Sequence, residues 1–327
     1  MQRIVAAALL VSLAGASGAV KATDVSVALY QGDRIAVVTM TFDDTKPSQL
    51  ERVVPLFNEF GYKCTFYVNS SRIGPNKQTS WEQWRAVAEA GFEVGNHTKG
   101  HWLKANDPDN SWCRDQILGG YKEIEDHIGI PPHTFAFPGG SVSERTLKVF
   151  RESAHIDYRH RNHKKKGDRL WVGEQQQTVE AGPGFVDRVM AHEETWNKSK
   201  LSWMITVMHD VTDEKERAIR AMLEYIKKHD DKVWCTTYST ATRYEREREE
   251  SRLTITESGD RYVAFSVTNR LDQAVFNVPL TVRIDTSHAP DTASAILAGT
   301  ELPTQVRGQR ILVDVVPGRE QVRVTWQ

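Results

Sequence analysis

Two neighbouring carboxylates, Asp43 and Asp44, close the apolar run IAVVTMTF at residues 35–42. Like charges in contact repel, so such a pair is costly unless one carboxyl group takes a proton or a cation intervenes. The pair can instead form a polar turn before a helix, because Asp is a common N-cap residue and Pro47 suits the first helical position. These residues therefore predict either a capped turn or a site for a cation.

Two histidines, His97 and His101, follow another apolar run, GFEVG at residues 91–95. A spacing of four residues brings both imidazoles to the same face of a helical turn or a tight loop, which suits a divalent metal. Unrelated surface or core histidines often share this spacing, so the pair alone does not identify a metal site.

Two further strand candidates end in residues that could take part in chemistry. The run FAFPGG at residues 135–140 ends in a Pro-Gly-Gly turn, which either leaves a backbone N–H open toward a ligand or is an ordinary turn. The run SWMITVMHD at residues 202–210 closes with His209 and Asp210, which either act in chemistry or cap the strand.

The elements that must position these residues alternate along the chain from about residue 35 to residue 250. Helix candidates at residues 48–60 and 111–128, and one that follows Ser80, end at glycines. Regular alternation predicts a parallel sheet of βα units, open or closed into a barrel, with its chemistry at the carboxyl ends of the strands. The strand candidates are residues 35–42, 63–68, 91–95, 133–138, 155–159, 202–208 and 232–238.

A different pattern begins after the charged run EREREE at residues 245–250. Short β-branched runs separated by Asn, Asp, Gly and Pro predict a small all-β unit. We interpret it as an immunoglobulin-like sandwich with a structural or accessory role, because its few aromatic residues alternate with polar ones as core residues do. The predicted division is a signal peptide at 1–22, a barrel at 23–250 and a β-sandwich at 251–327.

The beginning of the chain has the order of a secretory signal: Arg3, the apolar run IVAAALLVSLAGA and then small residues. We therefore expect an exported protein, periplasmic or secreted, with no stable membrane span once the signal is removed; an uncleaved anchor is the alternative. With 42 basic and 43 acidic side chains, the chain has no broad field to attract nucleic acid. Three scattered cysteines without a CxxC pair argue against thiolate zinc.

Together, the motifs TFDD, NHTKGH, FAFPGG and ITVMHD resemble the polysaccharide deacetylase family, also called the NodB homology domain or carbohydrate esterase family four. The resemblance covers roughly residues 37–244, and it implies a distorted (β/α) barrel and a divalent metal held by one aspartate and two histidines. Carried over, Asp44, His97 and His101 become the metal ligands. Zn²⁺ is the expected ion because two ligands are histidines, and Co²⁺, Ni²⁺ and Mn²⁺ are alternatives.

The same resemblance implies roles for the other motif residues. Asp43 becomes the general base that takes a proton from water, and His209 becomes the general acid that protonates the leaving amine. The N–H of Gly139, which follows Pro138, becomes a donor to the tetrahedral oxyanion.

This chain departs from the family in its third motif, which usually begins with Arg and has an aromatic residue before its last glycine. Ala136 and Gly139 stand at these positions. Since the family's arginine pairs with the catalytic base, we expect Arg159 or Arg161, on the next strand candidate, to reach the same place. A surface basic cluster is the alternative use of these two arginines.

The sequence therefore predicts an exported, metal-dependent hydrolase that removes N-acetyl groups from chitin, peptidoglycan or a poly-N-acetylglucosamine polymer. An O-acetyl xylan esterase on the same fold is the alternative within this chemistry, and a non-catalytic glycan-binding protein is the alternative from another class. The expected partner is an acetylated glycan, and no nucleic acid and no protein partner are implied.

Overall fold

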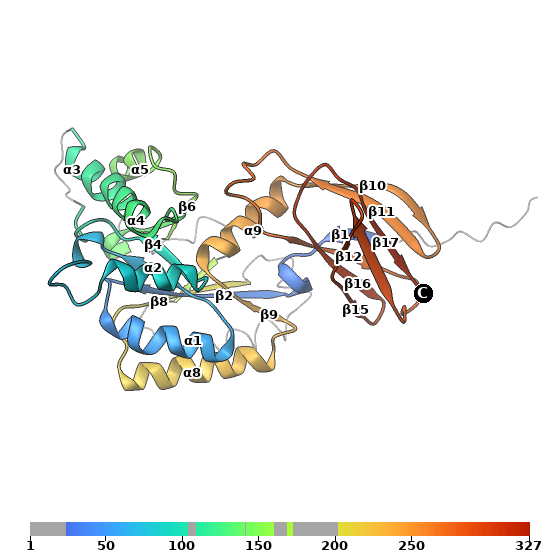
Figure 1. Ribbon diagram of the computed structural model, residues 1–327, viewed down its shortest axis with the longest axis horizontal. Coiled ribbons are helices and arrows are strands. Elements are labelled where there is room, and N and C mark those ends of the chain that lie inside the picture. The colour runs from blue at the N-terminus through green and yellow to red at the C-terminus, as the bar shows by residue number, and fades with distance from the viewer. Residues whose placement is uncertain (1–23, 104–108, 141, 160–168, 173–201) are drawn as a thin grey trace, which may run out of the picture.

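The computed structural model describes residues 24–103, 109–140, 142–159, 169–172 and 202–327. An α/β unit and an all-β unit lie side by side, and helix α9 (Tyr238–Glu250) runs from the first to the second (Figure 1). The predicted signal peptide and Arg161 lie outside the described residues.

An eight-stranded sheet forms the centre of the α/β unit, and its paired strands run parallel. The strand order is β6-β5-β4-β3-β2-β8-β7, and β9 pairs with the first half of β2. This curled parallel sheet confirms the predicted distorted (β/α) barrel; the sequence prediction missed only the short strand β7. The strands are β2 (Ala36–Asp43), β3 (Thr65–Val68), β4 (Glu93–Asn96), β5 (Thr134–Ala136), β6 (Asp157–Arg159), β7 (Arg169–Val172), β8 (Trp203–Met208) and β9 (Val233–Cys235).

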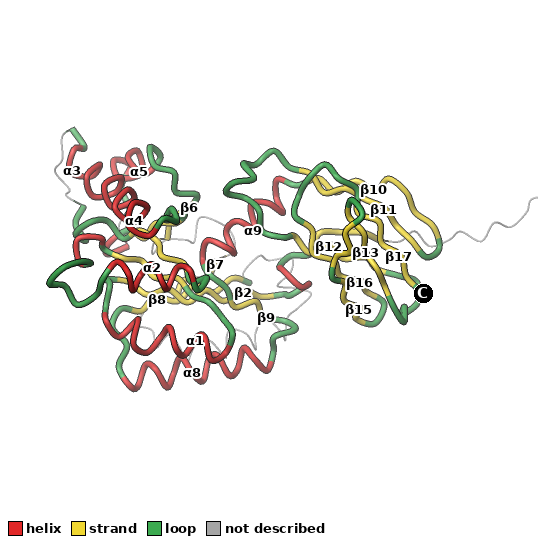
Figure 2. Tube along the Cα trace, viewed as in Figure 1, coloured by secondary structure: helices red, strands yellow, loops and turns green. Residues whose placement is uncertain are grey.

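Helices cover the outside of this sheet, with α1 and α8 packed side by side (Figure 2). The helical spans predicted at residues 48–60 and 111–128 are present as consecutive α and π turns, and they end at Gly61 and Gly129 with φ values of 76° and 81°. The helices are α1 (Val54–Phe60), α2 (Trp81–Glu89), α3 (Ser111–Arg114), α4 (Gly120–Ile128), α5 (Glu144–Phe150) and α8 (Asp213–Lys228), and the π turns are η2 (Gln49–Val53) and η4 (Asp115–Gly119).

Strand β2 lies in the middle of the sheet, and all of its residues are buried. Its residues alternate between two faces, as in any strand. Met40 and Phe42 pack into the apolar core with the helices, whereas Thr39, Thr41 and Asp43 occupy the opposite face. The barrel interior is therefore polar along β2, and this places Asp43 at its carboxyl end.

The all-β unit consists of two antiparallel sheets, in the orders β1-β12-β16-β15 and β10-β11-β17-β13-β14. Strand β1 (Asp24–Val27), which the sequence placed in the barrel, pairs with β12, because Val25 and Val27 pack against the core of this unit. The other strands are β10 (Arg252–Gly259), β11 (Tyr262–Thr268), β12 (Leu280–Asp285), β13 (Ala293–Leu297), β14 (Thr300–Leu302), β15 (Thr304–Arg307), β16 (Arg310–Val315) and β17 (Val322–Trp326).

One apolar core joins the two units. Trp203 and Trp234 of the barrel strands and Tyr244 of α9 pack in the same cluster as Val263 and Leu280 of the β-sandwich. The sandwich is thus packed onto the barrel and not merely tethered to it.

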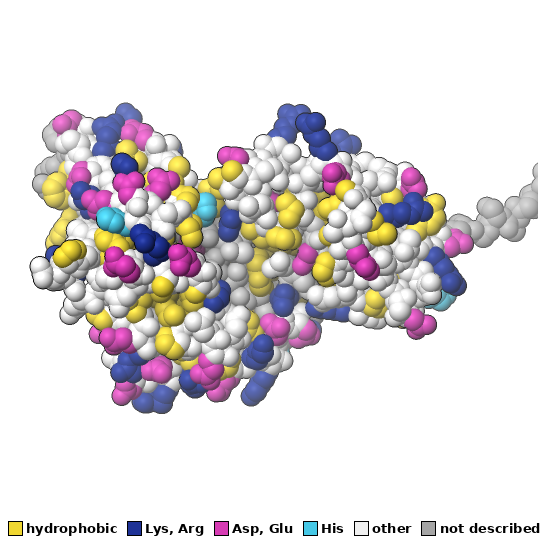
Figure 3. Space-filling view, in the orientation of Figure 1, with side chains coloured by type: hydrophobic (Ala, Val, Ile, Leu, Met, Phe, Trp, Pro, Cys, Tyr) yellow, Lys and Arg dark blue, Asp and Glu magenta, His cyan; other side chains and the backbone are white. Residues whose placement is uncertain are grey.

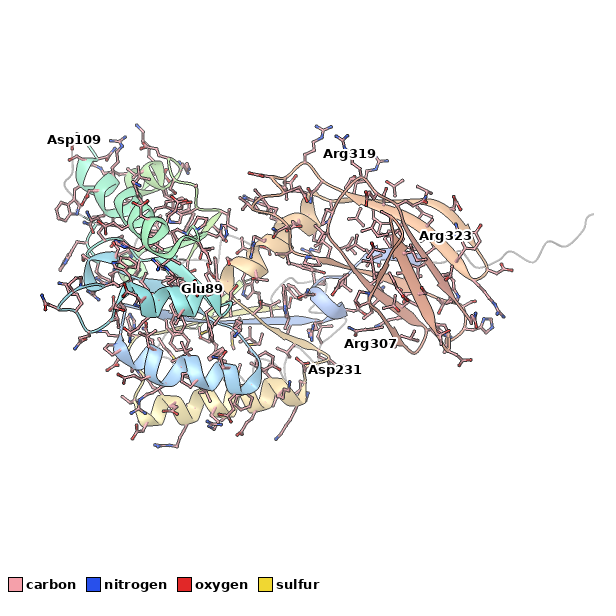
Figure 4. All side chains as sticks on the ribbon, viewed as in Figure 1. Glu89, Asp109, Asp231, Arg307, Arg319 and Arg323 are labelled. Carbon is pink, nitrogen blue, oxygen red and sulfur yellow. The ribbon has the colours of Figure 1, made fainter. Side chains whose placement is uncertain are left out.

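A polar cleft of about 440 Å³ also lies between the units. Asp231, in the loop before β9, and Arg307 of β15 line it from opposite sides (Figure 4). Arg310 in this cleft pairs with Asp33 at 3.2 Å and with Asp285 at 3.4 Å. Arg310 and Asp285 both belong to the all-β unit, and Asp33 lies in the turn η1 (Gln31–Asp33) between β1 and β2, so these pairs hold the connecting turn against the all-β unit.

The surface carries charges of both signs, which are interspersed over the visible face of both units (Figure 3). Within the part of the chain that the structure describes, no helix is long and apolar enough to cross a bilayer.

Candidate active site

The carboxyl end of β2 places two aspartates in different surroundings. Asp43 is the last residue of the strand and is 3% exposed, whereas Asp44 begins the loop with a φ of 79°. The main-chain N–H of Asp44 donates to the carbonyl of Tyr67 on β3 at 3.2 Å. Asp adopts a left-handed φ more readily than most residues with a Cβ, and contacts from neighbouring loops stabilise this turn.

The carboxyl end of β4 places the two histidines. The main-chain N–H of His97 donates to the carbonyl of Val68 at 2.8 Å. Thr98 and His101 have φ values of 70° and 71°, and the N–H of His101 donates to Oγ1 of Thr98 at 2.8 Å. A tight loop, and not a helical turn, therefore brings the two imidazole rings to a centroid separation of 4.9 Å.

Asp44, His97 and His101 form a cluster whose ligand atoms all lie within 4.8 Å of one another. Oδ1 of Asp44 is 3.3 Å from Nε2 of His101 and 3.8 Å from Nε2 of His97. Nδ1 of His97 lies 2.7 Å from the carbonyl oxygen of Ala136. Because a carbonyl oxygen can only accept, Nδ1 carries the proton, and the unprotonated Nε2 lies near both aspartates, 3.8 Å from Oδ1 of Asp44 and 3.7 Å from Oδ2 of Asp43.

This donor set fits a divalent cation. Among the described residues, nothing donates a hydrogen bond to the buried Oδ1 of Asp44, although Nη1 of Arg72 lies 3.1 Å from it as an ion pair. Burial lowers the pKa of His97 to about 4, against the opposing charge of Asp43, so its imidazole is in the neutral form that binds metals. One carboxylate and two imidazoles are the protein ligands of a common class of catalytic zinc site, which keeps a position open for water or substrate.

Asp43 is held by a buried arginine, Arg159. Nη2 of Arg159 donates to Oδ2 of Asp43, Nη1 donates to Oγ1 of Thr41, and the guanidinium carbon lies 4.8 Å from the centre of the Tyr67 ring. Burial alone raises the pKa of Asp43, but the charge and hydrogen bond of Arg159, with the charges of nearby histidines, lower this pKa below its ordinary value. The carboxylate is therefore kept ionised, and its Oδ1 accepts no hydrogen bond within the described ranges.

The register of the sheet explains how Arg159 comes to this position. Strands β5 and β6 pair in parallel with Ala136 opposite Arg159, so both residues lie in the same row of the barrel. Arg159 reaches across the interior to β2, as hypothesised for it from the sequence, and its side chain is 3% exposed. The other candidate, Arg161, lies outside the described residues.

His209 leaves the sheet beside Asp43. Phe42 of β2 pairs in register with Met208 of β8, so the next residue of each strand emerges at the same edge. Nε2 of Gln49 donates to the carbonyl oxygens of Asp43 at 2.6 Å and of His209 at 3.0 Å, which ties the two loops together. A positive charge on His209 contributes to the lowered pKa of Asp43.

Pro138 and Gly139 lie in the short turn η5 (Pro138–Gly140) that follows β5. Gly139 is exposed and has a φ of 63°, a conformation that suits glycine. The turn starts two residues after Ala136, whose carbonyl accepts the hydrogen bond of His97. The role of Gly139 toward an oxyanion stays a prediction.

Three residues that the sequence did not single out hold the loops of this site. The main-chain N–H of Asn69 donates to Oγ1 of Thr45 at 2.8 Å, and its Nδ2 donates to the carbonyl of His97 at 2.6 Å. Asn69 thereby links the aspartate loop to the histidine loop, Gln49 links β2 to β8, and Arg72 contacts the aspartate loop. Only Asn69 carried a signal, because it directly follows a strand candidate.

Known proteins match this chain over different lengths. Residues 31–155 match the family described as polysaccharide deacetylase. A gellan lyase from a Bacillus species is 25% identical over 92% of this chain, and the matched stretch is 13% of the lyase's own length. A peptidoglycan-N-acetylglucosamine deacetylase from Bacillus cereus is 25% identical over 58% of this chain and 80% of its own length.

Among solved structures, the peptidoglycan deacetylase PdaC from Bacillus subtilis matches 67% of this chain and 96% of its own. The sequence identity of this pair is 21%, and the TM-score is 0.47.

Proposed function

Since residues 31–155 of this chain belong to the polysaccharide deacetylase family, we propose that it is a metal-dependent hydrolase that removes N-acetyl groups from an amino-sugar polysaccharide or oligosaccharide. The observation that carries the proposal is the unequal environment of the two aspartates. Asp44 lies against two imidazoles and the partly exposed Arg72, and its Oδ1 accepts no hydrogen bond from the described residues, whereas Asp43 is held by the buried guanidinium of Arg159. One carboxylate is thus suited to a cation and the other to a proton.

In the proposed reaction Asp43 is the general base. Its Oδ2 is held by Arg159, which keeps the carboxylate ionised, and its Oδ1 is open to accept a proton from water as that water attacks the acetyl carbon. A divalent ion bound by Asp44, His97 and His101 would polarise the acetyl carbonyl and make water more acidic.

His209 is the proposed general acid. An amide anion is a very poor leaving group, so the C–N bond can break only as the nitrogen receives a proton, which His209 would donate. The N–H of Gly139 would donate to the oxyanion of the tetrahedral species. The products are acetate and the free amine of the sugar.

The choice of substrate rests on the relatives. The Bacillus cereus relative is named as a peptidoglycan-N-acetylglucosamine deacetylase, and this supports an N-acetylated glycan such as peptidoglycan, chitin or poly-N-acetylglucosamine. O-deacetylation of xylan would need the same base and metal ligands, so it is the second candidate. A non-catalytic glycan-binding protein would not need a base, a metal cluster and an acid in one site, so their combination favours an enzyme over this alternative.

A comparison of substrates and variants tests the proposal. We expect the purified protein with Zn²⁺ to release acetate from N-acetylglucosamine oligomers or peptidoglycan; activity on acetylated xylan alone would refute N-deacetylation. Asp43→Asn should abolish turnover and keep the metal, whereas Asp44→Asn should lose the metal. Asp213→Asn, which changes an exposed carboxylate on α8, is the matched control and should keep both.

We also propose that the chain is exported, on the order of charged, apolar and small residues in 1–22. Expression with this segment in a bacterial host should yield a mature protein outside the cytoplasm whose N-terminus lies near residue 20 or 23. Full-length protein that stays in the cytoplasm would contradict export.

A further inference from the structure

Arg72 contacts the proposed metal ligand Asp44 at two points. It belongs to the short turn η3 (Ser70–Arg72) that follows β3. Its Nη1 donates to the main-chain oxygen of Asp44 at 3.1 Å and also lies 3.1 Å from the Oδ1 atom of that residue. One guanidinium nitrogen is therefore hydrogen-bonded to the backbone and ion-paired with the carboxylate of a residue with a φ of 79°.

The two contacts of Arg72 differ in kind. Its Nη1 donates a hydrogen bond to the main-chain oxygen of Asp44, whereas its contact with Oδ1 is an ion pair, and Oδ1 accepts no hydrogen bond from the described residues. Arg72 therefore fixes the backbone of Asp44 and places a positive charge beside the carboxylate.

The turn that carries Arg72 is tied to the loop between the two histidines. The main-chain N–H and the Oγ of Ser71 both donate to the carbonyl of Lys99, at 3.0 Å and 2.6 Å. The main-chain N–H of Arg72 donates to the carbonyl of Asn69 at 2.9 Å. Arg72 thus connects the aspartate loop to the histidine loop through a fixed turn.

We propose that Arg72 is a positioning residue for the metal site, which holds the left-handed turn at Asp44 and directs its carboxylate toward His97 and His101. The inference rests on the proposed function, because it takes Asp44 as a metal ligand. It adds a residue from outside the four motifs to the support of the site.

Two effects of Arg72 on a bound cation oppose each other. Its positive charge repels a cation, but its side chain is 40% exposed, so water and salt screen much of this repulsion. Loss of the partner that orients a ligating group typically lowers metal affinity by about 10- to 100-fold. Orientation should therefore outweigh repulsion, and removal of Arg72 should weaken metal binding.

The test measures Zn²⁺ affinity by competition with a chromogenic chelator. We expect Arg72→Met to bind Zn²⁺ about 10- to 100-fold more weakly than the wild type, and Arg72→Lys to lie between them because a lysine keeps the charge but not the planar donor. Arg52→Met is the matched control: it removes the same charge from a surface pair with Asp213 and Glu216, and it should not change the affinity. The absorption spectrum of the Co²⁺ form should change in Arg72→Met and not in the control.

The outcomes separate this inference from the proposed function. Wild-type protein that binds Zn²⁺ together with Arg72→Met that binds it equally or more tightly would overturn the inference alone. Wild-type protein that binds no divalent ion would overturn both. If Arg72→Met fails to fold by circular dichroism, Arg72→Lys decides: weaker binding supports the inference, and wild-type affinity refutes it.

Discussion

Removal of the Arg159 guanidinium should raise the pKa of the proposed base, Asp43, and leave the metal cluster in place. Arg159→Met fills much of the same volume but carries no charge. Burial has the largest influence on the pKa of Asp43 and raises it. The charge and hydrogen bond of Arg159 lower this pKa, and the variant lacks both, so the pKa should rise. Since a base must be unprotonated to act, the acidic limb of the pH profile should move to higher pH.

The size of the effect follows from the burial of the pair. An adjacent arginine typically lowers the pKa of a carboxyl group by about 1 to 3 units, so the acidic limb of kcat/KM should move upward by about that much. The side chains of Arg159 and Asp43 are 3% and 5% exposed, and removal of one partner of such a buried pair costs about 3–5 kcal/mol.

The loss of stability in Arg159→Met should be larger at neutral pH than at low pH. In the wild type the lowered pKa of Asp43 contributes stability above the pKa of the unfolded chain, and this contribution is lost as the pH falls through the folded value. In Arg159→Met the buried carboxyl group is protonated more readily, which favours the folded state at low pH. The difference in unfolding free energy between wild type and variant should therefore shrink as the pH falls.

The assay combines kcat/KM on N-acetylglucosamine oligomers across pH with metal analysis. Arg220→Met, which removes an exposed arginine paired with Glu59, is the matched control and should keep the wild-type profile. An unchanged acidic limb in folded, metal-loaded Arg159→Met would refute the reasoning. Loss of the metal in that variant would show that Arg159 acts on the metal cluster and not on the base.

Three further predictions concern the metal ligand, a tight approach and a buried acid. Asp44→Asn should lower the Zn²⁺ content of the purified protein at least about tenfold, measured by elemental analysis, and full retention would contradict its role as a ligand. Gly120→Ala should cost about 1–3 kcal/mol in urea denaturation, because its Cβ would lie 2.8 Å from Oδ1 of Asn96, whereas Gly119→Ala meets mainly flexible side chains and should cost less. Burial raises the pKa of Glu247 from 4.5 to about 7, so the folded state binds this proton more tightly and stability falls as the pH rises through that range. Glu247→Gln should remove this fall in Tm between pH 5 and pH 8, and an unchanged slope would contradict it.

The strands of the barrel other than β7 could be predicted because most of them are buried apolar runs with a clear end. Strand β1 could not be assigned correctly, although its valines alternate, because a run of four residues pairs according to what lies nearby in space. Its partner is β12, more than 250 residues away, with Asp24 opposite Asp285. We predicted β1 in the barrel because it precedes the barrel strands in the sequence, but its pairing with β12 places it in the sandwich.

The motif residues could be predicted because parallel strands bring their carboxyl ends to one edge. The residues that hold the loops could not. Asn69 donates to the carbonyl of His97, and Arg72 donates to the carbonyl of Asp44. The direction of these carbonyls depends on the left-handed φ values of Asp44 and of Thr98, which follows His97. Such conformations in residues other than glycine leave no reliable mark in the sequence.

The partner of Asp43 shows why a motif can lose a residue and keep its contact. Strand pairing leads from Asp43 to Tyr67 on β3 and to Gly95 on β4, and the next residue of β4, Asn96, pairs with Phe135 of β5. Ala136 and Arg159 pair with each other one position beyond Phe135, so they lie two residues, or about 6.6 Å along the strands, past the row of Asp43. The long side chain of Arg159 spans that distance, and the small side chain of Ala136 leaves the interior open to it. The contact to Asp43 is therefore set by the pairing of β5 with β6, which no comparison of the third motif alone can detect.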